Sequence, residues 1–175
     1  FTLMPAMQFA GSVLEPKIVL IDGFIESVAE IDCLLQDAHA TMDHVLLFSR
    51  GMAHDVVNTL RVNHERGTLR VVPVHVPMDI DSLNTFADLS VVSGADVVSA
   101  HKGDLISTLR LAACPRVEYA SLHHGHLMLV ATATRRAVQL HIEELRRRRL
   151  VLEQEELGKL IDSRIRSLSP TTTRS

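Results

Sequence analysis

Short apolar runs alternate with amphipathic segments along the first 132 residues, and this alternation is typical of an α/β layered structure. The apolar run at residues 17–21 is followed by Asp22-Gly23, a turn signal, and then by a stretch with helical periodicity. The last two expected strands should form a hairpin around His124-Gly125, because glycine supplies the positive φ that a two-residue turn needs. We expect strands at residues 17–21, 44–48, 68–76, 97–98, 116–122 and 126–132, and helices at residues 25–40, 52–64 and 82–92.

Each expected helix carries one apolar stripe that should face a core. Apolar residues recur along each helix at the 3.6-residue period of an amphipathic helix. The stripes consist of Ile25, Val28, Ile31, Leu35 and Ala38 in the first helix, Met52, Val56 and Leu60 in the second, and Leu83, Phe86 and Leu89 in the third.

Three more apolar residues lie outside these stripes. Leu34 belongs to the first helix, and Val57 and Val62 belong to the second. Extra apolar residues on the outer faces of neighbouring helices indicate a groove for an apolar partner. Another layer of the protein could equally cover them, and the residues alone leave both interpretations open.

Length and composition exclude several classes of protein. A chain of 175 residues with 46% hydrophobic and 22% charged residues can bury one domain core with a short appendage. The formal charge of -3 gives no global basic field, so nucleic-acid binding would need a local patch. No apolar run approaches the roughly 20 residues of a membrane span. Cys33 and Cys114 form neither a disulfide framework nor a thiolate zinc motif, which favours a reducing compartment.

The last segment has helix-forming residues and no strand-like run. Residues 133–149 and 151–168 are rich in Arg, Glu and Leu and should pair as an antiparallel helical hairpin. The arginines at 146–149, with Arg135 and Arg136, could contact phosphates. Consecutive residues point around a helix and nearby glutamates neutralise these arginines, so we favour a solvated helix face. Residues 169–175 have nothing to bury and should be disordered.

No catalytic or cofactor-binding motif is evident. The string His123-His124-Gly125-His126 holds three imidazoles, but strand alternation sends neighbours to opposite faces, so a His-rich solvated turn is favoured over a metal site. The phosphate fingerprints GxxxxGK[ST] and GxGxxG and the nucleophile elbow GxSxG are missing. Cys33 lies mid-helix without the electropositive surroundings that activate a thiolate. We therefore expect no catalytic residue, no metal and no cofactor in this piece.

A collinear series of short motifs runs along the chain. They are Glu15-Pro16-Lys17-Ile18-Val19-Leu20-Ile21-Asp22, Thr59-Leu60, Val62-Asn63, Arg66-Gly67, Val71-Val72-Pro73-Val74-His75-Val76-Pro77 and Gly94-Ala95-Asp96-Val97-Val98-Ser99. Together these motifs resemble the apical domain of the group I chaperonins, the bacterial and organellar ring chaperones. Two later stretches resemble helices of the family's intermediate domain, namely Arg135-Arg136-Ala137-Val138-Gln139 and residues 160–168. Each motif is weak by itself, and the resemblance gains its force from their order along nearly the whole chain.

The resemblance implies an α/β apical core with two parallel surface helices, at 25–40 and 52–64, followed by a C-terminal helical hairpin. It divides the chain into an apical, polypeptide-binding domain at 1–132, a helical segment at 133–168 and a tail at 169–175. The implied function is capture of non-native polypeptide and, competitively, of a lid co-chaperonin in an apolar groove between the helices. The groove and the loop beneath it fall on Thr2, Ala6, Met7, Asp32, Leu35, Val57, Arg61, Val62 and Asn63.

Several of these positions depart from the family pattern. Asp32 and Arg61 stand where the family has leucine and valine, and Thr2 and Ala6 replace aromatic residues. Each polar replacement removes roughly 1.5–3 kcal/mol of possible apolar burial, so generic client binding should be weaker. One alternative is a chaperonin-derived interaction or scaffold module that no longer folds clients. A weaker one is a nucleic-acid-binding module that uses the arginines, for which binding should depend steeply on salt.

The rest of the implied machinery lies outside this piece. The chain begins at Phe1 without a Met or a signal sequence, so we expect a piece of a longer protein. The family's ATP and Mg site and its catalytic aspartate belong to other parts of the parent chain. That chain would form a homo-oligomeric ring, whereas this piece alone should be monomeric, with no nucleic-acid or membrane partner. The mitochondrial matrix and bacterial or phage cytoplasm are the expected locations.

Overall fold

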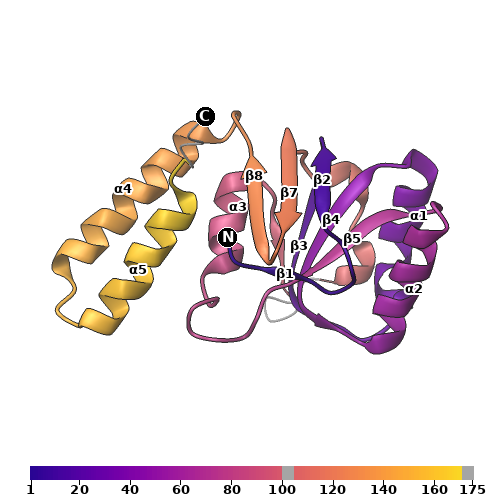
Figure 1. Cartoon of the computed structure of the whole chain (residues 1–175), viewed down its shortest axis with the longest axis horizontal. Helices are drawn as coiled ribbons and strands as arrows, with labels where there is room; N and C mark the ends of the chain where they lie inside the picture. The colour runs from indigo at the N-terminus through magenta and orange to yellow at the C-terminus, as the bar shows by residue number, and fades with distance from the viewer. Residues whose placement is uncertain (100–104, 171–175) are drawn as a thin grey trace.

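The computed structural model describes residues 1–99 and 105–170 of the chain. A five-stranded sheet and a three-stranded sheet share a core, and a helical hairpin projects from one end (Figure 1). The strands are β1 (Met4–Pro5), β2 (Gly11–Leu14), β3 (Lys17–Ile25), β4 (His44–Met52), β5 (Arg70–His75), β6 (Val97–Val98), β7 (Tyr119–His123) and β8 (His126–Val130). The helices are α1 (Asp32–Thr41), α2 (His54–Glu65), α3 (Thr85–Ser93), α4 (Arg135–Val151) and α5 (Glu155–Leu168), with short 3-10 turns η1 (Val28–Ile31), η3 (Ile106–Thr108) and η4 (Leu111–Ala113).

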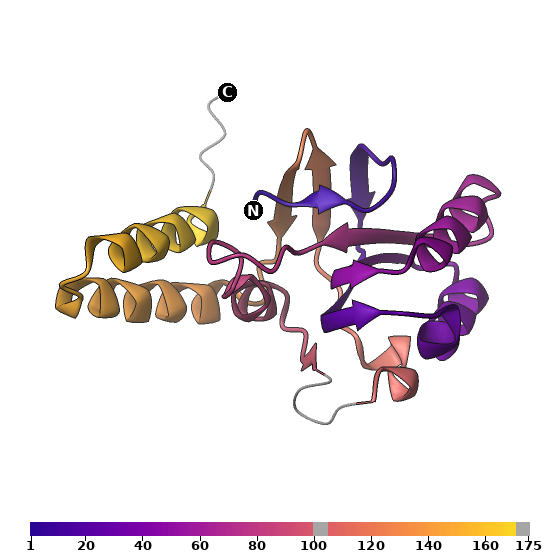
Figure 2. The same ribbon diagram turned by 90° about the horizontal axis from the view of Figure 1, so that it is seen from below.

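The larger sheet has the order β1-β5-β4-β3-β6, in which only β1 is antiparallel to its neighbour. The helices α1 and α2 connect β3 to β4 and β4 to β5. Crossovers between adjacent parallel strands share one hand, so consecutive helices lie on the same face of the sheet. The two helices are therefore parallel neighbours, as Figures 1 and 2 show. The α/β fold with two parallel surface helices is confirmed.

The central strands are buried on both faces. Their successive side chains point to opposite sides, so Ile18 and Leu20 face the three-stranded sheet and α3, whereas Val19 and Ile21 face α1 and α2. Burial on both faces explains why these strands appear in the sequence as continuous apolar runs.

The predicted β-hairpin is confirmed. The turn residues His124 and Gly125 both have positive φ, 50° and 76°, as a type I′ turn requires. His123 and His126 stand opposite each other at the end of the ladder. The first strand begins at Tyr119, three residues later than the sequence suggests.

Two predicted strand ends are wrong. Asp22-Gly23 and Ser49-Arg50-Gly51 lie inside β3 and β4, which continue to Ile25 and Met52 beyond an irregularity in their register. Phe24 stands opposite Gly51, where a Cβ would come within 2.9 Å of two Phe24 ring atoms. Pairing between the two extensions overrides the local turn signals, so Ile25 and Met52 belong to strands and not to helices.

The helical turn before α1 starts later than predicted. The Glu30 carboxylate accepts hydrogen bonds from the backbone N–H groups of Glu26 and Ser27, at 2.7 and 3.1 Å. This carboxylate satisfies donors that would otherwise be left free at a helix N-terminus, so Ser27 is the cap. The segment enters as η1 and becomes α-helical at Asp32.

Arg50 explains why the third helix also starts late. Its side chain is 7% exposed, pairs with Asp22 at 2.7 Å, and donates to the carbonyls of Pro77 and Ser82 at 2.7 and 3.2 Å. These bonds hold residues 77–84 as a loop. Leu83, predicted to face the core from a helix, is therefore 61% exposed ahead of α3.

The predicted helical hairpin is confirmed as α4 and α5. It joins α3 through a small apolar cluster and through the carboxylate of Asp88, which is 3% exposed. Arg164 of α5 donates to both oxygens of this carboxylate, at 2.9 and 2.7 Å, and His141 Nε2 of α4 lies 2.8 Å from it. One buried carboxylate thus ties three helices together. The division of the chain at residue 132 stays a prediction, and residues 171–175 of the expected disordered tail lie outside the described residues.

Candidate functional site

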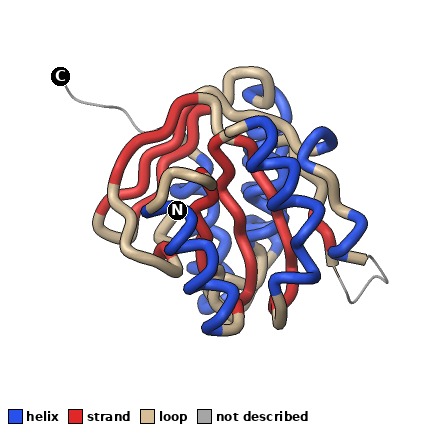
Figure 3. The backbone as a smooth tube through the Cα atoms, turned by 90° about the vertical axis from the view of Figure 1, so that its right-hand side faces the viewer, coloured by secondary structure: helices blue, strands red, loops and turns tan. Residues whose placement is uncertain are grey.

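The outer face of α1 and α2 exposes mainly polar side chains. Both helices bury their inner faces on the sheet and turn their outer faces to solvent (Figure 3). The exposed side chains of this face are Asp32, Gln36 and His39 of α1 and His54, Asp55, Asn58, Arg61 and Glu65 of α2. The face is suited to hydrogen bonding and charge recognition more than to burial of large apolar segments.

The two polar departures from the family pattern are satisfied within their own helices. Asp32 accepts a hydrogen bond from Gln36 at 2.6 Å. Arg61 donates to Glu65 at 2.9 Å and to Asn58 at 2.6 Å. Pairs with these spacings contribute only a few tenths of a kcal/mol in a helix, so a partner could displace them at low cost.

The apolar groove that the sequence suggested is largely closed. Leu34, placed on an outer face by its spacing, is 1% exposed, and Leu35 is 8% exposed, both within the core under α1. Val57 and Val62 remain half-buried on α2. The correction for Leu34 has a physical cause, because residues three and four apart share a helix face and Leu34 therefore joins Ile31 and Ala38 in the core.

The N-terminal loop lies against α2. Met7 is buried in the same apolar cluster against which Val57 packs. The Phe9 ring meets His64 edge to face, with 6.0 Å between ring centroids and an interplanar angle of 84°. Met7 and Val57 of the predicted set thus belong to one apolar cluster. Sequence reasoning missed Phe9, although an aromatic residue two positions after Met7 was available as a signal.

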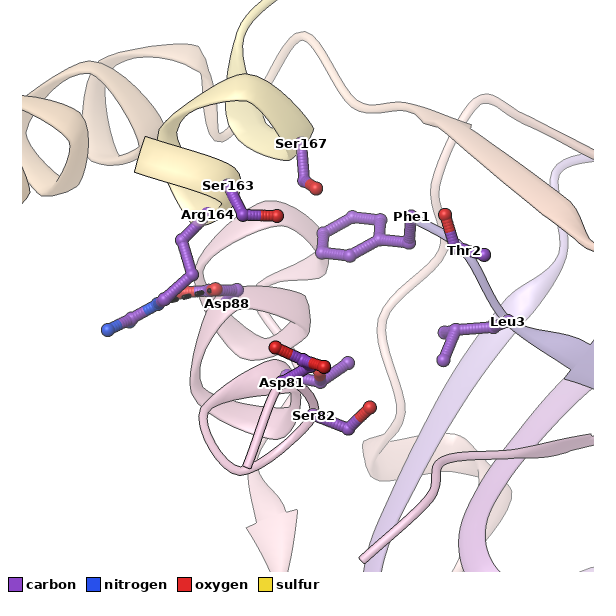
Figure 4. A pocket seen from close by; sticks show the side chains of 10 residues that line it. Phe1, Thr2, Leu3, Asp81, Ser82, Asp88, Ser163, Arg164 and Ser167 are labelled. Atoms are coloured by element: carbon purple, nitrogen blue, oxygen red, sulfur yellow. Dashed lines mark hydrogen bonds and ion pairs between the residues drawn. The ribbon is translucent and has the colours of Figure 1, made fainter. Parts of the chain in front are cut away.

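Three other predicted positions have different surroundings. Thr2 bridges to His126 and lines a cavity of about 130 Å³ beside the Asp88–Arg164 ion pair, away from α1 and α2 (Figure 4). Ala6 donates its backbone N–H to the Pro73 carbonyl at 2.8 Å. Asn63 donates to the Thr59 carbonyl at 2.8 Å and accepts from the Thr68 hydroxyl, so its side chain closes the C-terminal end of α2.

Three groups outside the predicted site have perturbed pKa values. Hydrogen bonds from Arg110 hold the pKa of the Asp37 carboxyl below its usual value. Burial lowers the pKa of His44 and raises that of the Cys114 thiol, so both stay neutral at physiological pH. Asp37 thereby joins α1 to the segment at Arg110 and Leu111, and none of the three groups belongs to the nine predicted site residues.

The described part of the chain was also searched for clusters of metal ligands and for membrane-spanning helices. Within residues 1–99 and 105–170, no three His, Cys, Asp or Glu side chains are grouped so that they could hold a metal ion. In the same residues, none of the helices combines the length and apolarity needed to cross a bilayer.

Comparison with known proteins identifies relatives of this chain. No protein-family model matches it. It is 24% identical over 143 residues to the protein named chaperonin GroEL 3 of Acaryochloris marina, which covers 81% of this chain. It is 33% identical over 89 residues, half of the chain, to a hydrogenosomal chaperonin HSP60 of Trichomonas vaginalis. The chain is therefore similar in sequence to chaperonins.

The fold agrees with this similarity in sequence. Two crystal forms of the chaperonin gp146 from bacteriophage EL match 90% of the chain with a TM-score of 0.64, at 16% and 14% identity. The chain spans only 27% and 19% of the two curated chaperonins and 32% of the phage protein. The predicted resemblance to chaperonins is confirmed, and the roles of the nine predicted site residues stay predictions.

Proposed function

We propose that this chain is a polypeptide-binding segment of a chaperonin-type protein, and that the α1–α2 face selects its partners by charge and hydrogen bonding as well as by apolar contact. Similarity to chaperonins in sequence and fold supports the general role. The observation that carries the selectivity is the exposure of Asp32 and Arg61 on a face whose apolar members, Val57 and Val62, are half-buried.

Apolar burial alone offers this face little binding energy. Burial contributes about 25 cal/mol per Å² of apolar surface removed from water, and half-buried valines have little such surface left. Leu35 could add further apolar surface to the contact only if α1 moved away from the core in which Leu35 is buried. A partner that pairs with Asp32 or Arg61 gains charge-assisted hydrogen bonds that an unselected apolar segment does not.

The proposal also includes the role of the parent protein from which this segment would come. The parent protein would be a ring that uses ATP and Mg at sites outside this segment. A lid co-chaperonin would compete with non-native polypeptide for the α1–α2 face. The parent would work in bacterial or phage cytoplasm or in an organelle matrix such as that of mitochondria. One similar protein is named hydrogenosomal, which is compatible with an organelle.

The test is a change of the two polar residues to the apolar ones of the family pattern. We expect Asp32→Leu/Arg61→Val to tighten binding of a permanently unfolded protein, reduced and carboxymethylated α-lactalbumin, by about tenfold or more, since about 1.4 kcal/mol of added burial suffices for that. Fluorescence anisotropy of the labelled unfolded protein measures the affinity.

A matched variant controls for nonspecific binding to any added apolar surface. Glu156→Leu/Arg166→Val makes the same kind of change at exposed positions of α5 and should leave binding unaltered. Equal tightening by both variants, or none by the first, would contradict the proposal. If the unaltered chain does not bind at all and only Asp32→Leu/Arg61→Val does, the scaffold module becomes the better account, because the polar face would then have replaced client capture.

A further inference from the structure

The cavity of about 130 Å³ beside the Asp88–Arg164 ion pair is lined by α5, by the N-terminal residues and by the segment that leads into α3. Figure 4 shows Ser163 and Ser167 of α5 on one side of it, Asp81 and Ser82 of the loop at residues 77–84 on another, and the Phe1 ring between them. Its volume is close to the roughly 150 Å³ of a cavity that holds benzene, so a ligand of about six non-hydrogen atoms fits.

Most of the polar side chains around this cavity take no part in holding the fold. Within residues 1–99 and 105–170, the Asp81 carboxylate forms neither a hydrogen bond nor an ion pair. In the same part of the chain, no side-chain hydrogen bond engages the lining hydroxyl groups, which belong to Thr2, Ser82, Thr85, Ser163 and Ser167. These groups are therefore available to donate to a ligand or to accept from it.

Asp81 supplies the uncompensated charge of the cavity wall. The other two charged lining residues, Asp88 and Arg164, neutralise each other through hydrogen bonds at 2.9 and 2.7 Å, and His141 Nε2 lies 2.8 Å from the same Asp88 carboxylate. An anion in the cavity would be repelled by Asp81, whereas a cation would gain a charge-assisted hydrogen bond.

Two further cations near the cavity are held by other partners. The guanidinium of Arg50, below the loop, pairs with Asp22 at 2.7 Å. The Phe1 amino group donates to the Leu127 carbonyl of β8 at 2.9 Å, and burial holds its pKa below the usual value. Neither cation therefore offsets the charge of Asp81.

Two more charged side chains lie near the cavity without lining it. Asp79 is two residues before Asp81 in the loop, and Arg166 adjoins Ser167 on α5. Because these two charges are opposite in sign, they change the balance of charge around the cavity little.

We propose that this cavity binds a small hydroxylated primary ammonium ion, an amino alcohol of about six non-hydrogen atoms. The ammonium group donates to Asp81, and the ligand's hydroxyl groups exchange hydrogen bonds with Ser163 and Ser167. The Phe1 ring offers an apolar surface to the ligand's carbon atoms and attracts its positive charge. The bound ligand bridges α5 and the loop before α3. This inference goes beyond polypeptide binding and does not depend on it, because the cavity lies away from α1 and α2.

Three probes of equal size and different charge test the proposal. They are the cation 2-amino-1,3-propanediol, neutral glycerol and the anion 3-hydroxypropionate. In amide NMR spectra of the isotope-labelled chain at low salt, we expect the amino alcohol to cause saturable shifts at millimolar concentration, in residues 81–85 and 163–167. Its affinity should exceed that of glycerol about tenfold, because a hydrogen bond to a carboxylate is stronger when the donor is charged. The anion should cause no saturable shift.

Variants separate the proposed contacts from general effects of charge. Asp81→Asn should weaken binding of the amino alcohol about tenfold and so remove its advantage over glycerol. Ser163→Ala/Ser167→Ala should weaken binding of both probes. The controls Asp79→Asn and Arg166→Gln change charges outside the cavity wall and should alter the affinity by no more than about twofold. The same spectra show whether each variant is folded.

Four results would overturn the proposal. The first is the absence of saturable shifts with the amino alcohol. The second is glycerol or the anion binding as tightly as the amino alcohol, which would remove the role of charge. The third is an Asp81→Asn variant that binds like the unaltered chain. The fourth is a set of shifts confined to residues that do not adjoin the cavity.

Discussion

Replacement of Arg164 by methionine is expected to lower the free energy of unfolding by about 3–5 kcal/mol, because it leaves a buried carboxylate without its bidentate partner. Asp88 is 3% exposed and its two oxygens accept both hydrogen bonds from Arg164. His141 keeps one contact at 2.8 Å, which places the expected loss towards the lower end of that range. Urea denaturation followed by circular dichroism measures the change.

The control for this prediction lies on the same helix. Arg166→Met alters an exposed arginine two residues further along α5 and should change the free energy of unfolding by no more than about 0.5 kcal/mol. The double variant Asp88→Leu/Arg164→Met should recover much of the lost stability, since it removes the stranded charge as well. Equal effects of Arg164→Met and Arg166→Met would show that the ion pair does not hold the hairpin to the core.

Replacement of Leu35 by serine is expected to cost about 2–5 kcal/mol of stability, as for other large-to-small changes in a core. Leu35 is 8% exposed and packs in the cluster that α1 and α2 share. Val62→Ser, on the same predicted site but half-buried, should cost clearly less. Thermal unfolding of the two variants compares them directly.

The stability of the Leu35→Ser variant determines how a loss of polypeptide binding by that variant is interpreted. If Leu35→Ser destabilises the chain as expected, its loss of polypeptide binding reports unfolding and not a lost contact. Similar stabilities of the two variants would mean that Leu35 is not a core residue. The open apolar groove suggested by the sequence would then be the better description of this face.

The sequence predicts the elements that depend on local pattern. Buried strands with apolar runs, the amphipathic hairpin of α4 and α5, and the turn at His124-Gly125 all follow from spacing or from glycine. The short strands β1 and β2 were not predicted, because each forms by pairing with a segment far away in the sequence. The extensions of β3 and β4 arise in the same way, since Phe24 needs Gly51 opposite it.

The candidate site, too, could be predicted from the sequence only in part. Asp32 and Arg61 were expected to make the face polar, and the structure shows both on the surface. Spacing predicted the burial of Leu35 but placed Leu34 on an outer face, and Leu34 is buried because it adjoins Ile31 and Ala38 at helical spacings of three and four residues. The contact of Phe9 with His64 depends on the path of a loop, which no periodicity encodes.

Amide hydrogen exchange with and without reduced, carboxymethylated α-lactalbumin tests the central claim most directly, because it locates the bound polypeptide on the molecule. We predict slower exchange in Asp32–Thr41 and His54–Glu65, the two helices of the proposed face, and unchanged exchange in α4 and α5. Slower exchange confined to the loop at residues 78–83 or to the hairpin, with α1 and α2 unaffected, would contradict the account.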